Sequence, residues 1–218
     1  MEPTEKQIKV ERTAQYYTMG NDIKAASHIW YIFHGYGQLA SRIIRKFDHL
    51  DLDEHFVIAP EGLSKFYFSR NPTVMGASWM TSHQRLSEIE DYLKYLDQVY
   101  SKIKAQMYDG QKLNVLGFSQ GSSTMWRWIA HHRPALHAII VWAGEYPPDV
   151  DYHSISAYLA DIKHKYYCLG NKDEFITDQM YDKQKRFATD HHLDFDLKKF
   201  SGKHKIDRTV LAEVVAQL

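Results

Sequence analysis

The sequence predicts an α/β fold, in which a doubly wound, mostly parallel sheet carries helices on both faces. Short apolar runs alternate along the chain with longer segments whose apolar residues recur every three or four positions. Several of the short runs are apolar on both parities, which is typical of strands buried on both faces. The length of 218 residues suits one domain of this class, and no Pro/Gly/Ser-rich linker or internal repeat divides the chain. We therefore expect a single domain over residues 1–218.

The expected elements follow in chain order. Apolar residues on one parity from Ile8 to Tyr16 predict an edge strand that leads to a turn at 20–22. Apolar or alternating runs predict further strands at 28–33, 56–59, 113–118, 138–142, 165–169 and 193–200. Helical spacing of apolar residues predicts helices at 43–47, 86–103, 122–131, 178–190 and 210–218. Residues 61–80, which include Pro72, show no clear period, so we expect an excursion over the surface.

Composition and charge exclude several classes of protein. The 27 Lys and Arg residues balance 27 Asp and Glu residues, so the chain lacks the basic excess of a nucleic-acid-binding protein. A single cysteine, Cys168, excludes an intrachain disulfide and favours a reducing compartment. No apolar run approaches the length of a membrane span, and the N-terminal residues lack the apolar core of a secretory signal. We expect a soluble, cytoplasmic protein with no integral membrane segment and no nucleic-acid partner.

A candidate nucleophile follows the strand expected at 113–118. Residues 117–121 read Gly-Phe-Ser-Gln-Gly, a G-x-S-x-G motif between a strand and a helix, which is the context of a nucleophile elbow. The turn is so tight that side chains at Gly117 and Gly121 would collide with each other or with the adjoining strand. It raises the Ser119 hydroxyl above the sheet edge and sets the positive end of the next helix beneath it. Ser119 is therefore the predicted nucleophile.

A serine nucleophile needs a base, and the base needs an orienting carboxylate. In sheets of this type the chain order is serine, acid and histidine, each at the carboxyl end of a strand. Asp173 is the first carboxylate after the strand at 165–169, and the adjacent Glu174 ranks second. We interpret the remaining candidate carboxylates, which follow no strand end, as solvated surface residues: Asp149, Asp151 and Asp161.

His204 is the predicted base, because it follows the last expected strand and precedes the last expected helix. Two pairs of histidines compete with it. His191 and His192 end a helix before that strand, whereas His131 and His132 end an earlier helix, where histidines usually interact with the last carbonyl groups.

The loop at 34–37, His-Gly-Tyr-Gly, follows a buried strand and is placed to supply one oxyanion-hole donor. We predict the backbone N–H groups of Tyr36 and Gln120 as the two donors, and we interpret His34 as a packed structural imidazole. No H-E-x-x-H, C-x-x-C or dinucleotide-binding glycine motif is present, so neither a metal nor a cofactor is expected.

Together these residues resemble the phospholipase/carboxylesterase family of small serine hydrolases, which includes the acyl-protein thioesterases. The resemblance runs over nearly the whole chain and includes the H-G-x-G loop, Ala59-Pro60, Ser78-Trp79 and the G-F-S-Q-G elbow. It implies an α/β-hydrolase fold with a minimal lid domain or none, and no cofactor. The chain departs from the family pattern at Gln38, at 174–176 and at 145–164, which bears on substrate identity more than on mechanism.

The predicted activity is hydrolysis of a carboxylic ester or thioester, in a small molecule or an acylated substrate, through an acyl-enzyme intermediate. Apolar walls of the substrate pocket are predicted at Tyr36, Trp79 and Phe175. Two alternatives stay open at this point. The same triad could serve a peptidase or lactonase, and a non-catalytic binding protein could share the fold, although such proteins usually lose a triad member.

Overall fold

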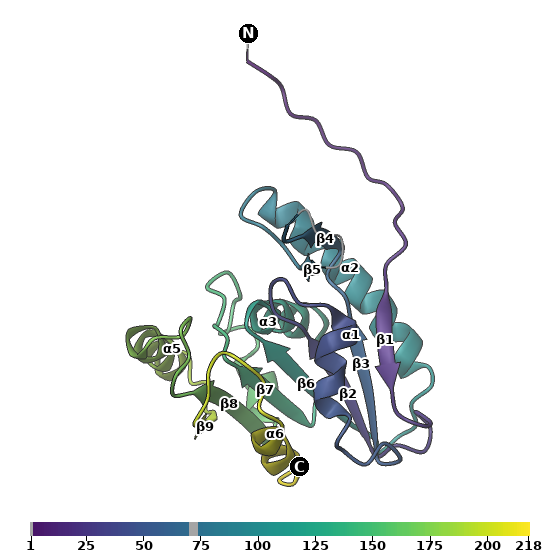
Figure 1. Ribbon diagram of the computed structural model, residues 1–218, viewed down its shortest axis with the longest axis vertical. Coiled ribbons are helices and arrows are strands. Elements are labelled where there is room, and N and C mark those ends of the chain that lie inside the picture. Colours follow the sequence, from purple (N-terminus) through teal and green to yellow (C-terminus); the bar gives the residue numbers. More distant parts are fainter. Residues whose placement is uncertain (1, 70–73) are drawn as a thin grey trace.

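The computed structural model describes residues 2–69 and 74–218 and is built around a seven-stranded sheet (Figure 1). Its strands are β1 (Tyr16–Met19), β2 (His28–Phe33), β3 (His55–Pro60), β6 (Lys112–Phe118), β7 (Ala138–Trp142), β8 (His164–Gly170) and β9 (Asp196–Phe200). They lie in the order β1-β3-β2-β6-β7-β8-β9. Only β1 runs antiparallel to its neighbour, and the other six strands are parallel. The predicted, mostly parallel sheet is confirmed.

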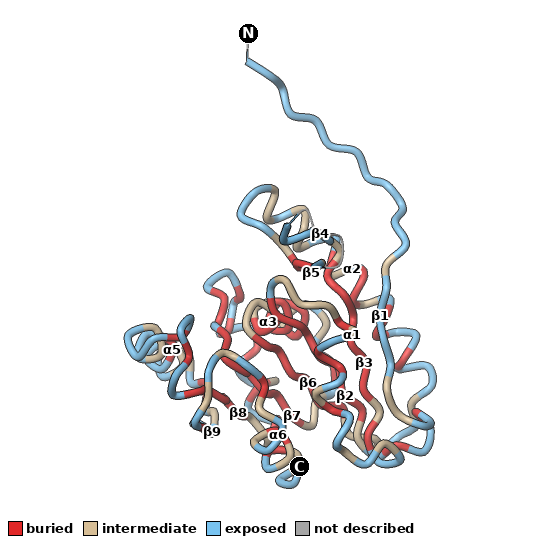
Figure 2. The backbone as a smooth tube through the Cα atoms, viewed as in Figure 1, coloured by how far each residue is buried: buried red, intermediate tan, exposed pale blue. Residues whose placement is uncertain are grey.

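Helices cover both faces of this sheet. They are α1 (Ala40–Ile43), a 3₁₀ turn η1 (Ile44–Phe47), α2 (Arg85–Lys104), α3 (Gln120–His132), α4 (Ser156–Ala160), α5 (Asp178–Asp190) and α6 (Arg208–Val215). On β2, Tyr31 and Phe33 belong to the core shared with α2 and α3, whereas Trp30 and Ile32 belong to the core shared with α1, η1 and α6. The alternation of side chains along a strand thus creates two cores, and Figure 2 shows the buried strands between them.

Two expectations about local structure are wrong, one on the edge strand and one on the segment 61–80. The edge strand is only β1, and Ile8 and Val10, 87% and 77% exposed, lie on the N-terminal segment before it. The pairing of β1 begins where Tyr16 faces Pro60, and β3 ends at Pro60, so residues before Tyr16 have no strand to pair with. The segment 145–164 contains α4, which the sequence pattern did not predict.

The segment 61–80 is not an irregular excursion. It contains an antiparallel hairpin of β4 (Ser64–Tyr67) and β5 (Met75–Ser78), although Pro72 itself lies outside the described residues. Gly37 N–H donates to Ala77 O at 2.8 Å, and Ala77 N–H donates to Gln38 O at 3.1 Å. The hairpin is therefore hydrogen-bonded to the loop that follows β2. In the part of the chain that the structure describes, no helix is both long and apolar enough to cross a bilayer.

Candidate active site

Ser119 stands at a sharp turn between β6 and α3. Its backbone has φ 54° and ψ −123°, a strained conformation for a residue with a side chain. A Cβ atom on Gly117 would lie 2.5 Å from Ser122 Cα, and one on Gly121 would lie 2.6 Å from His34 O. The two glycines are therefore required by close backbone approach, for the reason inferred from their spacing.

Asp173 and His204 are in direct contact, although 31 residues separate them in the chain. The Nδ1 atom of His204 lies 2.8 Å from Asp173 Oδ2. The Asp173 side chain is fully buried, and its Oδ1 accepts the N–H groups of Phe175 and Ile176 at 2.8 and 2.9 Å. An ionised carboxylate only accepts hydrogen bonds, so Nδ1 carries a proton. In a neutral His204 the Nε2 atom is then left as the free acceptor.

The loops that carry Asp173 and His204 are joined by their backbones. Lys172 N–H donates to Gly202 O at 2.8 Å, and a Cβ on Gly170 would collide with Lys203 O at 2.7 Å. Because both loops follow neighbouring parallel strands, β8 and β9, they meet at the same edge of the sheet. The position of His204 is thus fixed by backbone contacts as well as by Asp173.

The same edge holds the turn at Ser119. The ring of His204 lies 4.9 Å, centroid to centroid, from the ring of Phe118, the residue before Ser119. Among the described residues, no hydrogen bond joins the Ser119 hydroxyl to His204. Such bonds are often long in unliganded sites and shorten when substrate binds. The structure therefore brings Asp173 and His204 together and sets His204 beside the elbow.

Both predicted oxyanion-hole donors lie beside Ser119. A Cβ on Gly35 would lie 3.2 Å from Ser119 Cβ, so the loop at 34–37 passes directly over the elbow. In this loop, Gly35 N–H donates to Gln38 Oε1 and Gly37 N–H to Ala77 O, whereas Tyr36 N–H has no partner among the described residues. Gln120 begins α3, where an N–H group has no acceptor within the helix.

His34 has the structural role expected for it. It is completely buried, and burial lowers its pKa to about 4, so the ring is neutral. Its Nε2 accepts the Gly62 N–H at 2.9 Å, and its Nδ1–H therefore donates to Gly35 O at 2.8 Å. The ring stacks on Trp79, with centroids 4.8 Å apart. These contacts occupy both ring nitrogens, which leaves no free nitrogen for a substrate.

The competing histidines are held elsewhere. The Nδ1 atom of His191 lies 2.9 Å from Phe187 O on α5, as expected at a helix end. His131 and His132 do not bind the last carbonyl groups of α3. Instead both contact Asp97 on α2, at 3.0 and 2.9 Å, which corrects the interpretation from sequence. The two histidines therefore link α3 to α2 through Asp97 and do not cap α3.

Asp149 is exposed, as expected for a surface residue, but it is also paired with two arginines. Its two oxygens each lie 2.9 Å from the Arg127 guanidinium, and Arg85 approaches to 2.8 Å. Hydrogen bonds from Arg127 lower the pKa of Asp149 to about 2. Glu174, the second-ranked acid, is exposed, and no hydrogen bond to His204 is formed by it in the described structure.

The predicted pocket aromatics differ in exposure. Tyr36 and Phe175 are 59% and 62% exposed, and the Phe175 ring lies 4.8 Å from that of His204. Trp79 is 1% exposed, so it lies beneath the site as a packing residue and offers no free wall. Sequence reasoning missed Phe66, whose ring stacks on Tyr36 at 5.3 Å, because the hairpin that carries it was not predicted.

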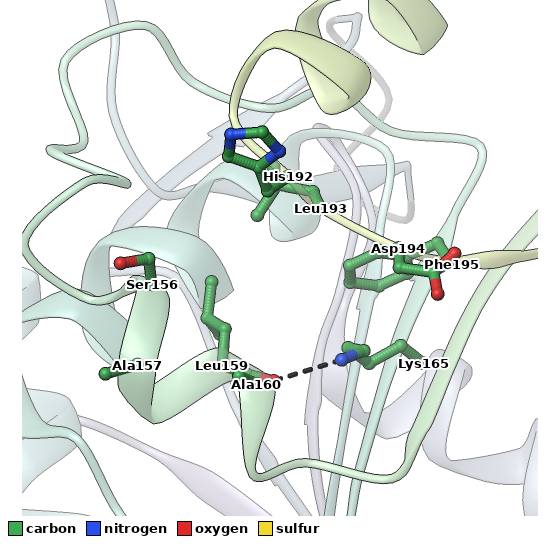
Figure 3. Close-up of a pocket in the computed structure, with 9 residues that line it drawn as sticks. All are labelled: Ser156, Ala157, Leu159, Ala160, Lys165, His192, Leu193, Asp194 and Phe195. Atoms are coloured by element: carbon green, nitrogen blue, oxygen red, sulfur yellow. Dashed lines mark hydrogen bonds between the residues drawn. The ribbon is translucent and has the colours of Figure 1, made fainter.

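Two cavities of the described structure lie away from Ser119, Asp173 and His204. One has a volume of about 330 Å³ and is bounded by α4 and the segment before β9, with Lys165 at one side (Figure 3). The other, of about 300 Å³, lies between α2, α3 and Asp149. Neither is lined by Ser119, Asp173 or His204. Among the described residues, no group of three or more His, Cys, Asp or Glu side chains is arranged so that it could hold a metal ion.

Comparison with known proteins identifies the fold. No protein-family model matches the sequence, and no curated protein matches it significantly. Solved structures do match, several of them over almost their whole length. The chain superposes on acyl-protein thioesterase 2 of Zea mays with a TM-score of 0.68 and 14% identity, covering 94% of this chain and 97% of that one.

Two further structures give the same result. For esterase PE8 the TM-score is 0.65 with 21% identity, covering 94% of this chain and 98% of that one. For a phospholipase/carboxylesterase of Dyadobacter fermentans the TM-score is 0.63 with 18% identity, covering 95% and 99%. These protein classes are the ones that the sequence motifs resemble, and no group of elements in the described residues forms a separate lid. The chain has the α/β-hydrolase fold.

Proposed function

We propose that this protein is a serine hydrolase of carboxylic esters or thioesters, with Ser119, His204 and Asp173 as its triad. The observation that carries the proposal is the 2.8 Å contact between Asp173 and His204, located beside the strained elbow at Ser119. Structural neighbours that are esterases and thioesterases support the same class of reaction. We extend the proposal to a single domain that acts without metal or cofactor.

The first half of the reaction acylates the enzyme. His204 Nε2 takes the proton of Ser119 as Oγ adds to the substrate carbonyl carbon, and the carbonyl oxygen becomes an oxyanion. The N–H groups of Tyr36 and Gln120 stabilise this charge, aided by the positive end of α3. The tetrahedral intermediate then expels the alcohol or thiol, which receives the proton from His204. An ester between Ser119 and the acyl group remains.

The second half regenerates the enzyme with the same groups. His204 removes a proton from water, and the resulting hydroxide adds to the acyl carbon. The oxyanion collapses, the Ser119 oxygen leaves with the proton from His204, and the carboxylic acid is released. Asp173 keeps the proton on Nδ1 throughout and stabilises the imidazolium that forms in each half.

A series of p-nitrophenyl esters from acetate to palmitate, together with an acyl thioester, tests the activity and its chain-length preference. The wild-type protein and the Ser101→Ala control, which alters an exposed serine on α2, should hydrolyse at least one substrate, and Ser119→Ala should lose about 10⁶-fold in kcat. A fluorophosphonate probe should label the first two proteins and leave Ser119→Ala unlabelled.

The outcomes separate the candidate classes. A folded wild-type protein that neither hydrolyses these substrates nor reacts with the fluorophosphonate would be a binding protein, and the proposal would be wrong. Labelling of Ser119 with turnover of amide or lactone substrates alone would also contradict the ester assignment while leaving the triad in place.

A further inference from the structure

Three residues at the end of the hairpin, Ser78, Trp79 and Met80, link the two proposed oxyanion donors. We call them the 78–80 strap. The strap lies between the start of α3, which carries Gln120, and the loop at 34–37, which carries Tyr36. The two donors belong to different elements, so something must fix the distance between them.

At one end the strap is held by the side chain of Gln120. Its Oε1 atom accepts the Trp79 N–H at 3.2 Å, and its Nε2 donates to Met80 O at 2.9 Å. The same residue supplies a proposed donor with its backbone N–H. The amide side chain of Gln120 therefore ties the first residue of α3 to the strap by these two hydrogen bonds and by a longer contact, 3.4 Å, with the Ser78 hydroxyl.

At the other end the strap is held through Trp79. The indole Nε1–H donates to His34 O at 2.8 Å, and the indole stacks on the His34 ring. The His34 Nδ1–H in turn donates to Gly35 O. That carbonyl belongs to the same planar peptide group as the Tyr36 N–H, so the hydrogen bond fixes the direction of the proposed donor.

We propose that the Gln120 side chain and the Trp79 indole are positioning residues that set the geometry of the oxyanion hole. The proposal rests on the function proposed above. A continuous set of contacts runs from the Gln120 amide through Trp79 and His34 to the Tyr36 N–H. Stabilisation of an oxyanion depends on where its donors stand, and a displacement of about 1 Å in such a site costs on the order of 10²-fold in rate.

Two variants break the set at different points. Methionine in Gln120→Met has a similar size and loses the hydrogen bonds of the Gln120 side chain to the strap. Trp79→Phe keeps an aromatic ring on His34 and loses the bond to His34 O. The matched control is Gln184→Met, because Gln184 is a buried glutamine on α5 whose Oε1 accepts the N–H of Tyr146 at 2.8 Å. In the described structure no hydrogen bond joins its side chain to a proposed site residue.

The measurements are kcat and KM for a hydrolysed p-nitrophenyl ester, per active site counted by complete fluorophosphonate labelling. A trifluoromethyl ketone provides the second readout. Its carbonyl carbon is attacked by Ser119, and the oxyanion formed occupies the same position as that of the reaction. A variant that merely folds less well would have fewer labelled sites, but each site would keep its rate and its inhibitor affinity.

We expect both variants to lose about 10- to 100-fold in kcat with KM changed less than about threefold, and to bind the ketone more weakly by the same factor as the loss in kcat/KM. Gln184→Met should keep the wild-type values per labelled site. The double variant should lose no more than about the larger single loss, because both changes break one set of contacts.

Wild-type rates and ketone affinities per labelled site in both variants would overturn the proposal, and so would additive losses in the double variant. An inert wild-type protein that does not react with the fluorophosphonate would instead refute the proposed function, so the two failures are distinguishable.

Discussion

Replacing Asp173 by asparagine tests how the acid controls the base. The carboxylate has two distinct sides. Oδ1 accepts two backbone N–H groups, from Phe175 and Ile176, and Oδ2 faces His204 Nδ1. In Asp173→Asn the amide oxygen must stay toward the two N–H groups, because an NH₂ group there would oppose two donors. The amide NH₂ then faces His204 Nδ1.

This orientation moves the proton on the imidazole. Facing a donor, Nδ1 must accept, so the proton of neutral His204 resides on Nε2. That is the atom required to take the proton of Ser119. An asparagine that imposes the wrong tautomer lowers kcat by about 10⁴ in a serine protease triad, or about 5 kcal/mol of transition-state stabilisation. We expect a loss of this size, with the fold retained.

The assay is p-nitrophenyl ester hydrolysis per mole of folded protein, with the rate of fluorophosphonate labelling as a second measure. Asp207→Asn is a matched control, because Asp207 Oδ1 also accepts two N–H groups, those of Thr209 and Val210, at the start of α6. Glu174→Gln tests the second-ranked acid. Retention of kcat within tenfold in Asp173→Asn, or a comparable loss in Glu174→Gln, would refute the reasoning.

Two further predictions concern the backbone and pH. Gly121→Ala places a methyl group against Phe33 O and His34 O, so we expect its Tm to fall by an amount that corresponds to about 3 kcal/mol of unfolding free energy. The control is Gly110→Ala, where the methyl group meets open space but φ is 100°, and there we expect a loss of about 1 kcal/mol. Equal losses of stability in the two variants would contradict the close approach at Gly121. Burial lowers the pKa of His34 to about 4 from its usual 6.5, so the unfolded chain binds that proton first. The stability that this group confers is complete above pH 6.5 and is lost as pH falls towards 4. We expect the unfolding free energy measured in urea to fall between pH 7 and pH 5 by about 2 kcal/mol more in the wild type than in His34→Gln. Identical falls in the two proteins would refute the predicted pH dependence.

The sheet could be predicted because its signals are local. Runs such as 28–33 and 138–142 are apolar on both parities, and only burial on both faces stabilises such strands. The hairpin of β4 and β5 could not be predicted in this way. Its strands have four residues each, and hydrogen bonds from Gly37 and to Gln38 help to hold it, which no pattern within 61–80 encodes.

In the candidate site too, some features could be predicted from local sequence signals and others depend on tertiary contacts. The order of strand ends pointed to Asp173 and His204, and the structure places them 2.8 Å apart. The pairing of Asp149 with Arg127, 22 residues away, depends on how the segment after β7 returns over α3. The contacts of the Gln120 side chain likewise need the tertiary structure, since Trp79 lies 41 residues earlier.

The central claim is that Ser119 carries the acyl group between the two halves of the reaction. The direct measurement is the mass of the protein after mixing with p-nitrophenyl acetate and quenching in acid within the first turnovers, followed by peptide mapping. We predict one added acetyl group per chain, on the peptide that contains Ser119, and none in Ser119→Ala. Release of p-nitrophenol at the wild-type rate by Ser119→Ala, or an acetyl group found only on another residue, would contradict the account.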